Sequence, residues 1–217
     1  KVFKKKKITV LTGTLADNID DEKVLISIGV EGNSTGMGLK GLGLEFSDNN
    51  HIAVNEHGKT NIDNIYAVGD VIGAPWLAHV SAAEGLYVAE HLCGLNPKQI
   101  DYNSIPACTY SKPEVASIGA TEQTLVDSNV EFKVAKSFFI SNGKAVAVGS
   151  TDGFIKILVG TKGDILGAHI VGSNATEMIS ELSIIKTNNL TIENIFNSVH
   201  PHPTFSEAIF ETLLQLK

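Results

Sequence analysis

The order of apolar and polar residues changes character near residue 101. Before that point, short apolar runs at 8–11, 24–28 and 65–68 are rich in β-branched residues and predict strands. A stretch over 76–92 instead repeats small and apolar residues at helical spacing, so we expect a helix there. The first part of the chain is therefore predicted to hold short strands followed by one helix.

After residue 101 the pattern is denser. Apolar and β-branched runs predict five strands, at 107–110, 115–120, 131–140, 154–159 and 165–171. A glycine-rich segment between the last two predicts a hairpin. Apolar stripes at helical spacing predict one helix over 174–188 and a final helix after residue 204. Strands with helices along one side describe an α+β unit, so we assign the chain to the α/β class.

The composition of the chain limits the class of protein to which it can belong. The 217 residues are 43% hydrophobic and 19% charged, as in an ordinary globular protein. The net charge is −7 and every basic residue is Lys, which argues against a nucleic-acid partner. No apolar run reaches the roughly 18 residues that a membrane span needs. Cys93 and Cys108 match neither a metal nor a C-x-x-C spacing, so we expect free thiols in a reducing compartment.

The start of the chain lacks an initiator Met. A run of lysines leads directly into the apolar stretch at 8–11, as if the sequence entered in the middle of a domain. We therefore expect this chain to be a piece of a longer polypeptide.

The residues near the end carry the strongest chemical signal. His200 and His202 are each followed by Pro, which holds the preceding backbone extended, and Glu207 follows five residues after the second imidazole. This arrangement suits a general base whose carboxylate partner fixes its tautomer. Thr204 and Glu207 also form a capping-box pattern, and spacing alone favours that explanation. A His-x-His metal site is a third interpretation, although no third ligand cluster accompanies it.

Two further features lie around the predicted helix at 76–92. Asp70 follows a predicted buried strand beside Gly69, where a carboxylate can bind a sugar or polyol hydroxyl. An Asp that closes its own turn is the simpler alternative. The segment Trp76-Leu77-Ala78-His79 opens the helix, and its N–H groups and positive dipole end suit an electron-rich ring. His79 taken alone is more typical of a surface or interface histidine.

Together and in this order, these residues resemble the C-terminal half of the flavin-dependent pyridine nucleotide-disulphide oxidoreductases, over essentially the whole chain. Residues 60–70 resemble the family's second FAD motif, whose Asp, here Asp70, holds the ribityl chain. The segment 76–79 is similar to the one whose backbone amides contact the flavin ring. Ser27-Ile28-Gly29 resembles the end of the NAD domain, which implies that Gly29 lies near the nicotinamide cofactor.

The resemblance also assigns roles at the C-terminal motif. It implies that His202 is the base and Glu207 its partner, acting in the active site of the other subunit of a homodimer. The doubled histidine favours the members that oxidise dihydrolipoamide with NAD⁺. His200 has no carboxylate at the matching spacing, so we expect it to matter less. Another disulfide reductase of the family, or a non-catalytic dimerisation module, remains an alternative.

The same resemblance implies partners and a location. The substrate would be dihydrolipoamide on a lipoyl domain of a 2-oxoacid dehydrogenase complex or of the glycine cleavage system. We expect no nucleic acid, membrane or metal. The implied compartment is the cytoplasm in a bacterium or the mitochondrial matrix in a eukaryote.

The implied domain organisation leaves several family features outside this sequence. Residues 1–47 would be the remnant of the NAD-binding domain, 48–100 an FAD-contacting central segment, and 101–217 the dimerisation domain. The family's glycine-rich FAD and NAD motifs and its redox-active cysteine pair belong before residue 1. Val30 also stands where a basic residue is typical. We therefore expect this chain alone to bind FAD and NAD weakly or not at all.

Overall fold

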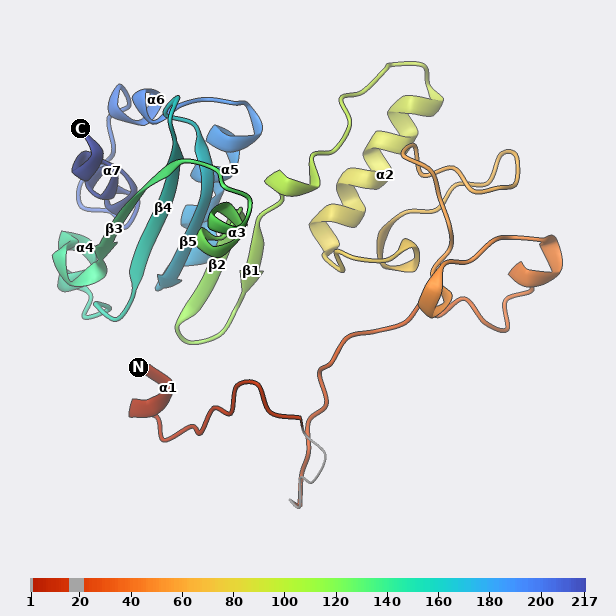
Figure 1. The fold of residues 1–217 in the computed structure, drawn as a ribbon, viewed down its shortest axis with the longest axis horizontal. Coiled ribbons are helices and arrows are strands. Elements are labelled where there is room, and N and C mark those ends of the chain that lie inside the picture. Colours follow the sequence, from red (N-terminus) through yellow and green to blue (C-terminus); the bar gives the residue numbers. More distant parts are fainter. Residues whose placement is uncertain (1, 16–21) are drawn as a thin grey trace. The chain divides into compact units, whose positions relative to one another are not determined.

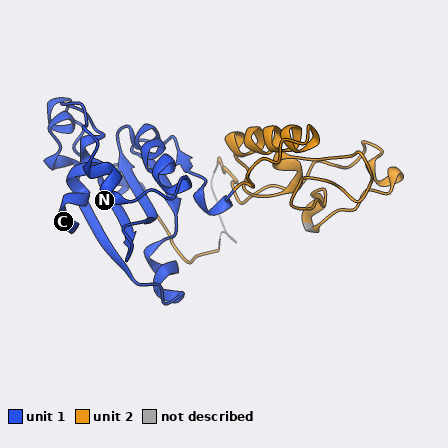
Figure 2. Ribbon diagram, turned by 90° about the horizontal axis from the view of Figure 1, so that it is seen from above, with its two compact units in different colours: residues 1–9, 101–217 blue, residues 10–100 orange. Residues whose placement is uncertain are grey.

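The computed structural model describes residues 2–15 and 22–217. Two compact units make up the chain, one of residues 1–9 with 101–217 and the other of residues 10–100 (Figure 2).

The unit that contains residues 101–217 is built on a five-stranded antiparallel sheet with the order β1-β2-β5-β4-β3 (Figure 1). The strands are β1 (Ala107–Thr109), β2 (Glu114–Gly119), β3 (Phe132–Phe138), β4 (Phe154–Gly160) and β5 (Ile165–Gly172). The five predicted strands and the hairpin between the last two are confirmed. In that hairpin, the Gly160 N–H donates to the Asp164 carbonyl oxygen at 2.9 Å.

Helix α1 (Val2–Lys5) lies near the start of the chain, and the other helices of this unit lie between strands or after the last strand. They are α3 (Glu122–Asp127), α4 (Gly143–Ala147), α5 (Ala175–Thr187), α6 (Ile192–Phe196) and α7 (Glu207–Leu213). Helix α5 packs against β2 and β5, and α7 packs against β3 and β4. The predicted helices at 174–188 and after residue 204 are therefore confirmed.

Alternation along the strands separates the two faces of the sheet. The residues that face α5 and α7 are buried and apolar: Ala116, Ile118, Ala135, Ile155, Ile157, Ala168 and Ile170. Directly paired residues on the opposite face form the row Ser117, His169, Lys156 and Lys136. Because successive side chains of a strand point to opposite faces, one side of the sheet forms the core.

The unit of residues 10–100 has less regular structure. Helix α2 (Ala78–Leu92) confirms the predicted helix. The expected strands at 8–11 and 24–28 are wrong, because no ladder forms there and Leu25 is 93% exposed. The expected buried strand at 65–68 is half-buried and makes only an isolated bridge through Tyr66. A β-rich sequence becomes a strand only where a neighbouring strand pairs with its backbone.

Short 3-10 helices complete the described part of the chain. They are η1 (Leu39–Leu42), η2 (Asp48–Asn50), η3 (Gly69–Ile72), η4 (Tyr102–Ser104), η5 (Phe139–Ser141) and η6 (Leu214–Leu216). Within the same described residues, no helix has the length and apolar character to cross a membrane.

Candidate functional site

His202 and Glu207 form a hydrogen-bonded pair at the start of α7. The Nδ1 atom of His202 lies 2.8 Å from Oε1 of Glu207, and the imidazole side chain is 77% exposed. An ionised carboxylate can only accept a hydrogen bond, so this contact places the ring proton on Nδ1. The exposed ring therefore presents Nε2 as a proton acceptor.

The second oxygen of Glu207 is held by the backbone. Oε2 accepts a hydrogen bond from the Thr204 N–H at 2.7 Å. The capping box is only half formed, because the Thr204 hydroxyl donates to the Pro201 carbonyl oxygen at 2.8 Å and the N-cap of α7 is Ser206. The hydrogen bond from the Thr204 N–H lowers the pKa of Glu207 below its ordinary value. The hydrogen bond with His202 acts in the same direction and is the second largest cause. Glu207 is therefore ionised at neutral pH. It is both the partner of His202 and one half of the capping box, the two roles that its spacing suggested.

His200 also has a carboxylate partner, which the sequence did not reveal. Its Nε2 lies 2.8 Å from Oε1 of Glu181 on α5, and its side chain is only 10% exposed. No carboxylate stands five residues after His200, as the sequence shows, and its partner comes instead from α5. Glu181 lies 19 residues earlier and on another helix, so local spacing could not identify it.

A buried asparagine borders the same loop. Asn142 is 1% exposed, and its Nδ2 donates to the Thr204 carbonyl oxygen at 3.1 Å. Its Oδ1 accepts from the Ala145 N–H at 2.9 Å and caps α4. A Cβ placed on the adjacent Gly143 would lie 3.9 Å from Cε1 of His202, so α4 begins beside the imidazole. An Asn before a short helix is an N-cap signal, but the bond to Thr204 has no local signature.

The two histidines of the motif have separate partners. His200 and His202 are bound to different carboxylates. No cluster of three or more His, Cys, Asp or Glu residues that could hold a metal ion occurs in the part of the chain that the structure describes. The two cysteines, Cys93 and Cys108, are both free.

The second group of predicted residues lies around the start of α2. Asp70 is exposed in η3, directly after Gly69. The Gly69 N–H donates to Oε2 of the buried Glu84 at 2.6 Å, and a Cβ on Gly69 would lie 2.7 Å from Oγ of Ser81. Ser81 and Glu84 are α2 residues, so the helix fixes the turn that presents Asp70. Sequence reasoning missed Glu84.

Trp76, just before α2, lies beside Gly29, another of the predicted site residues. The helix begins at Ala78, and no side chain caps its N-terminus at Leu77. The Trp76 ring stacks on His51 with ring centroids 6.1 Å apart. Gly29 has φ +114, and a Cβ there would lie 3.9 Å from the Trp76 ring. The structure thus brings together Gly29 and Trp76, which lie far apart in the sequence.

Asp70 and the start of α2 offer two kinds of group that a cofactor could contact. Asp70 directly follows Gly69, whose N–H is bound to Glu84 in the second turn of α2, the helix that begins at Ala78. A carboxylate beside a helix N-terminus suits a polyol chain that leads to an electron-rich ring. Residues 27–30 are exposed and carry no charge, so they offer a ligand the Ser27 hydroxyl and backbone groups only.

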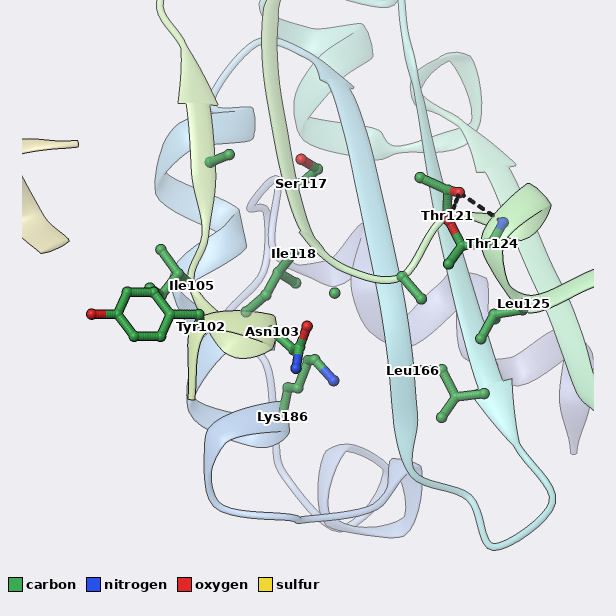
Figure 3. Close-up of a pocket in the computed structure, with 13 residues that line it drawn as sticks. Tyr102, Asn103, Ile105, Ser117, Ile118, Thr121, Thr124, Leu125, Leu166 and Lys186 are labelled. Carbon is green, nitrogen blue, oxygen red and sulfur yellow. Dashed lines mark hydrogen bonds between the residues drawn. The ribbon is translucent and has the colours of Figure 1, made fainter. Parts of the chain in front are cut away.

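A separate pocket of about 530 Å³ opens beside β2 and α3 (Figure 3). The hydroxyls of Thr121 and Thr124 lie 2.7 Å apart, and Lys186 Nζ lies 3.4 Å from the Ile165 carbonyl oxygen. Its lining contains no carboxylate or imidazole.

Comparison with known proteins gives consistent matches. A family model described as the dimerisation domain of pyridine nucleotide-disulphide oxidoreductases matches residues 105–213, and a model of pyridine nucleotide-disulphide oxidoreductases matches residues 1–85. Dihydrolipoyl dehydrogenase of Zymomonas mobilis is 38% identical, over 99% of this chain and 51% of that protein. Dihydrolipoyl dehydrogenase of Bacillus subtilis is 43% identical, over 89% of this chain and 41% of that protein.

A solved structure also matches this chain. LpdA from Mycobacterium tuberculosis superposes with a TM-score of 0.81 and 25% identity, over 86% of this chain and 41% of that one. The chain thus spans about half the length of the relatives it matches. It belongs to the pyridine nucleotide-disulphide oxidoreductase family.

Proposed function

We propose that this chain is the C-terminal part of an FAD-dependent dihydrolipoyl dehydrogenase, which oxidises dihydrolipoamide to lipoamide with NAD⁺ as the acceptor. The observation that carries the proposal is the exposed imidazole of His202, whose Nδ1 is bound to Glu207 at 2.8 Å. The names of the curated relatives support the choice of substrate.

The chemistry of the pair follows from its hydrogen bonds. The Nε2 atom of His202 accepts the proton of a dihydrolipoamide thiol, because the thiolate is the nucleophile in disulfide exchange. Glu207 stabilises the imidazolium that forms, and the Thr204 N–H keeps that carboxylate in place. When bound, FAD supplies two-electron chemistry between the thiol pair and NAD⁺. Asp70 and residues 76–79 would hold the flavin, and Gly29 would lie near the nicotinamide.

The proposal includes the organisation of the enzyme. Residues 1–47 belong to the NAD-binding domain, residues 48–100 to the FAD-contacting segment and residues 101–217 to the dimerisation domain. The pair then serves the active site of the partner subunit in a homodimer. The reduced substrate arrives on a lipoyl domain of a 2-oxoacid dehydrogenase complex or of the glycine cleavage system. Because the relatives in this comparison are bacterial, we propose the cytoplasm as the compartment.

The test is a comparison of thiol substrates with the longer polypeptide that contains this chain. We expect rapid NAD⁺ reduction with dihydrolipoamide, and little turnover when glutathione disulfide is offered with a reduced nicotinamide nucleotide. The opposite preference would assign the protein to another disulfide reductase of the family. No turnover with any thiol would favour the non-catalytic dimerisation module.

We expect the 217-residue chain by itself to bind FAD weakly and to lack dihydrolipoamide turnover. The physical reason is that its flavin contacts, around Asp70 and the start of α2, cover only one end of such a ligand. Titration of the apo chain with FAD, followed by absorbance after gel filtration, measures this. A purified chain that retains one flavin per polypeptide would contradict the expectation.

We expect residues 101–217 to make a two-fold dimer. The family model that matches this region describes a dimerisation domain, and such interfaces use the same surface of both subunits. Light scattering of the chain at tens of micromolar should therefore give twice the monomer mass. A monomer at that concentration would argue against the homodimer.

A further inference from the structure

The placement of His202 requires support from outside its own side chain. The imidazole is 77% exposed and its hydrogen bond is to Glu207, itself on the following helix. The loop begins at Val199, whose side chain is 98% exposed and gives the loop no attachment to the core. We propose that Asn142 and Glu181 are positioning residues, which hold the loop on either side of His202 and so aim the base. This inference rests on the proposed function.

The first attachment precedes the base by two residues. His200 is nearly buried, and its Nε2 is bound to Glu181 on α5 at 2.8 Å. The ring also lies against Phe210 of α7, with centroids 5.8 Å apart. Helix α5 is packed against the sheet through its buried residues, among them Leu182, next to Glu181. The backbone just before His202 is therefore fixed to the rigid core.

The second attachment follows the base by two residues. The Thr204 carbonyl oxygen accepts from Nδ2 of Asn142, and the Thr204 N–H donates to Glu207. Asn142 is 1% exposed and uses both ends of its amide, since its Oδ1 caps α4. It therefore fixes the loop and the start of α4 with one side chain.

The two attachments act on the same short segment. Between His200 and Thr204 lie three residues, so the backbone of His202 has little freedom once both ends are held. A base displaced by about 1 Å can lose as much as 10²-fold in rate. The position of the base is thus set by two side chains that need not touch the substrate.

The experiment separates geometry from charge in the longer enzyme. Glu181→Ala removes the partner of His200, whereas Glu181→Gln keeps an oxygen that can accept from Nε2. We expect Glu181→Ala to lower kcat by about 10-fold or more with KM nearly unchanged, and Glu181→Gln to restore most of it. His200→Gln should likewise stay near wild type, because its amide can donate to Glu181.

Asn142→Ser is the second test variant in this experiment. Serine is a good N-cap and can keep the bond to the Ala145 N–H, but it is too short to reach the Thr204 carbonyl oxygen. We expect kcat to fall by about 10- to 100-fold. Ile118→Val is the control, since it trims a buried side chain on β2 away from the loop and should leave kcat unchanged.

A second measurement uses the 217-residue chain and needs no activity. In chains with ¹⁵N-labelled histidine, the ring nitrogens of His202, assigned with His202→Gln, should show a proton fixed on Nδ1. Asn142→Ser and Glu181→Ala should each give a mixture of tautomers, while Ile118→Val should not. Thermal melting of each variant shows that the chain is folded.

The outcomes distinguish this inference from the proposed function. Inactive wild-type enzyme would overturn the proposed function, while the NMR arm would still test the positioning. Active wild type with unchanged kcat and tautomer in Asn142→Ser and Glu181→Ala would overturn the positioning alone. A Glu181→Gln enzyme as slow as Glu181→Ala would also overturn it, because the charge of Glu181 would then be what matters.

Discussion

Replacing His202 by Gln in the longer enzyme is expected to lower turnover with dihydrolipoamide by about 10²–10⁴-fold, the range for loss of a general base. The Gln amide can bond to neighbours of the ring but cannot accept a thiol proton at neutral pH. Steady-state rates of NAD⁺ reduction, measured over a range of pH, test this. The dependence of kcat on the ionisation of the base should disappear together with the rate.

Two other histidines serve as controls for this substitution. His200→Gln should cost far less, because the buried pair with Glu181 can persist through the amide. His169→Gln, on the face of the sheet opposite α5 and α7, should leave turnover unchanged. A His202→Gln enzyme that matches either control would exclude His202 as the base.

The part of the fold that the sequence predicts well is the part whose pattern is satisfied locally. Strands β2, β4 and β5 are rich in apolar and β-branched residues, and the sheet buries one face of them against α5 and α7. Helix α3 begins after Thr121, because the Thr121 hydroxyl accepts the Thr124 N–H at 3.0 Å. Each of these features depends on neighbours within a few residues or on the period of the pattern.

The features that sequence reasoning missed depend on partners from other elements. Glu181 reaches His200 from α5, Asn142 reaches Thr204 from the start of α4, and Glu84 holds Gly69 from α2. No spacing rule links such residues before the helices are packed. The opposite error occurred at 24–28, where a β-rich run found no neighbouring strand. Propensity therefore identified candidate elements, and tertiary contacts decided which became elements and which side chains met.

Glu207→Gln should reduce turnover by about 10- to 100-fold, less than loss of the base itself. The carboxylate accepts from both His202 Nδ1 and the Thr204 N–H, whereas an amide has only one oxygen to accept with. Its NH₂ group must then face one of the two donors. The ring either loses its fixed tautomer or keeps it at the expense of the bond to Thr204.

The lowered pKa of Glu207 gives this prediction a pH signature. A carboxyl whose folded pKa lies below its ordinary value adds stability that is present above the ordinary value and is lost as pH falls through the folded pKa. The support of Glu207 for the imidazolium is therefore complete at neutral pH and disappears only in acid. Glu207→Gln removes it at every pH, so the pH profile of kcat should shift and the acid dependence of loop stability should weaken. If Glu207 served only as a cap, the amide would keep most of that role. Wild-type turnover with an unshifted profile in Glu207→Gln would therefore refute the pair as the acid–base unit.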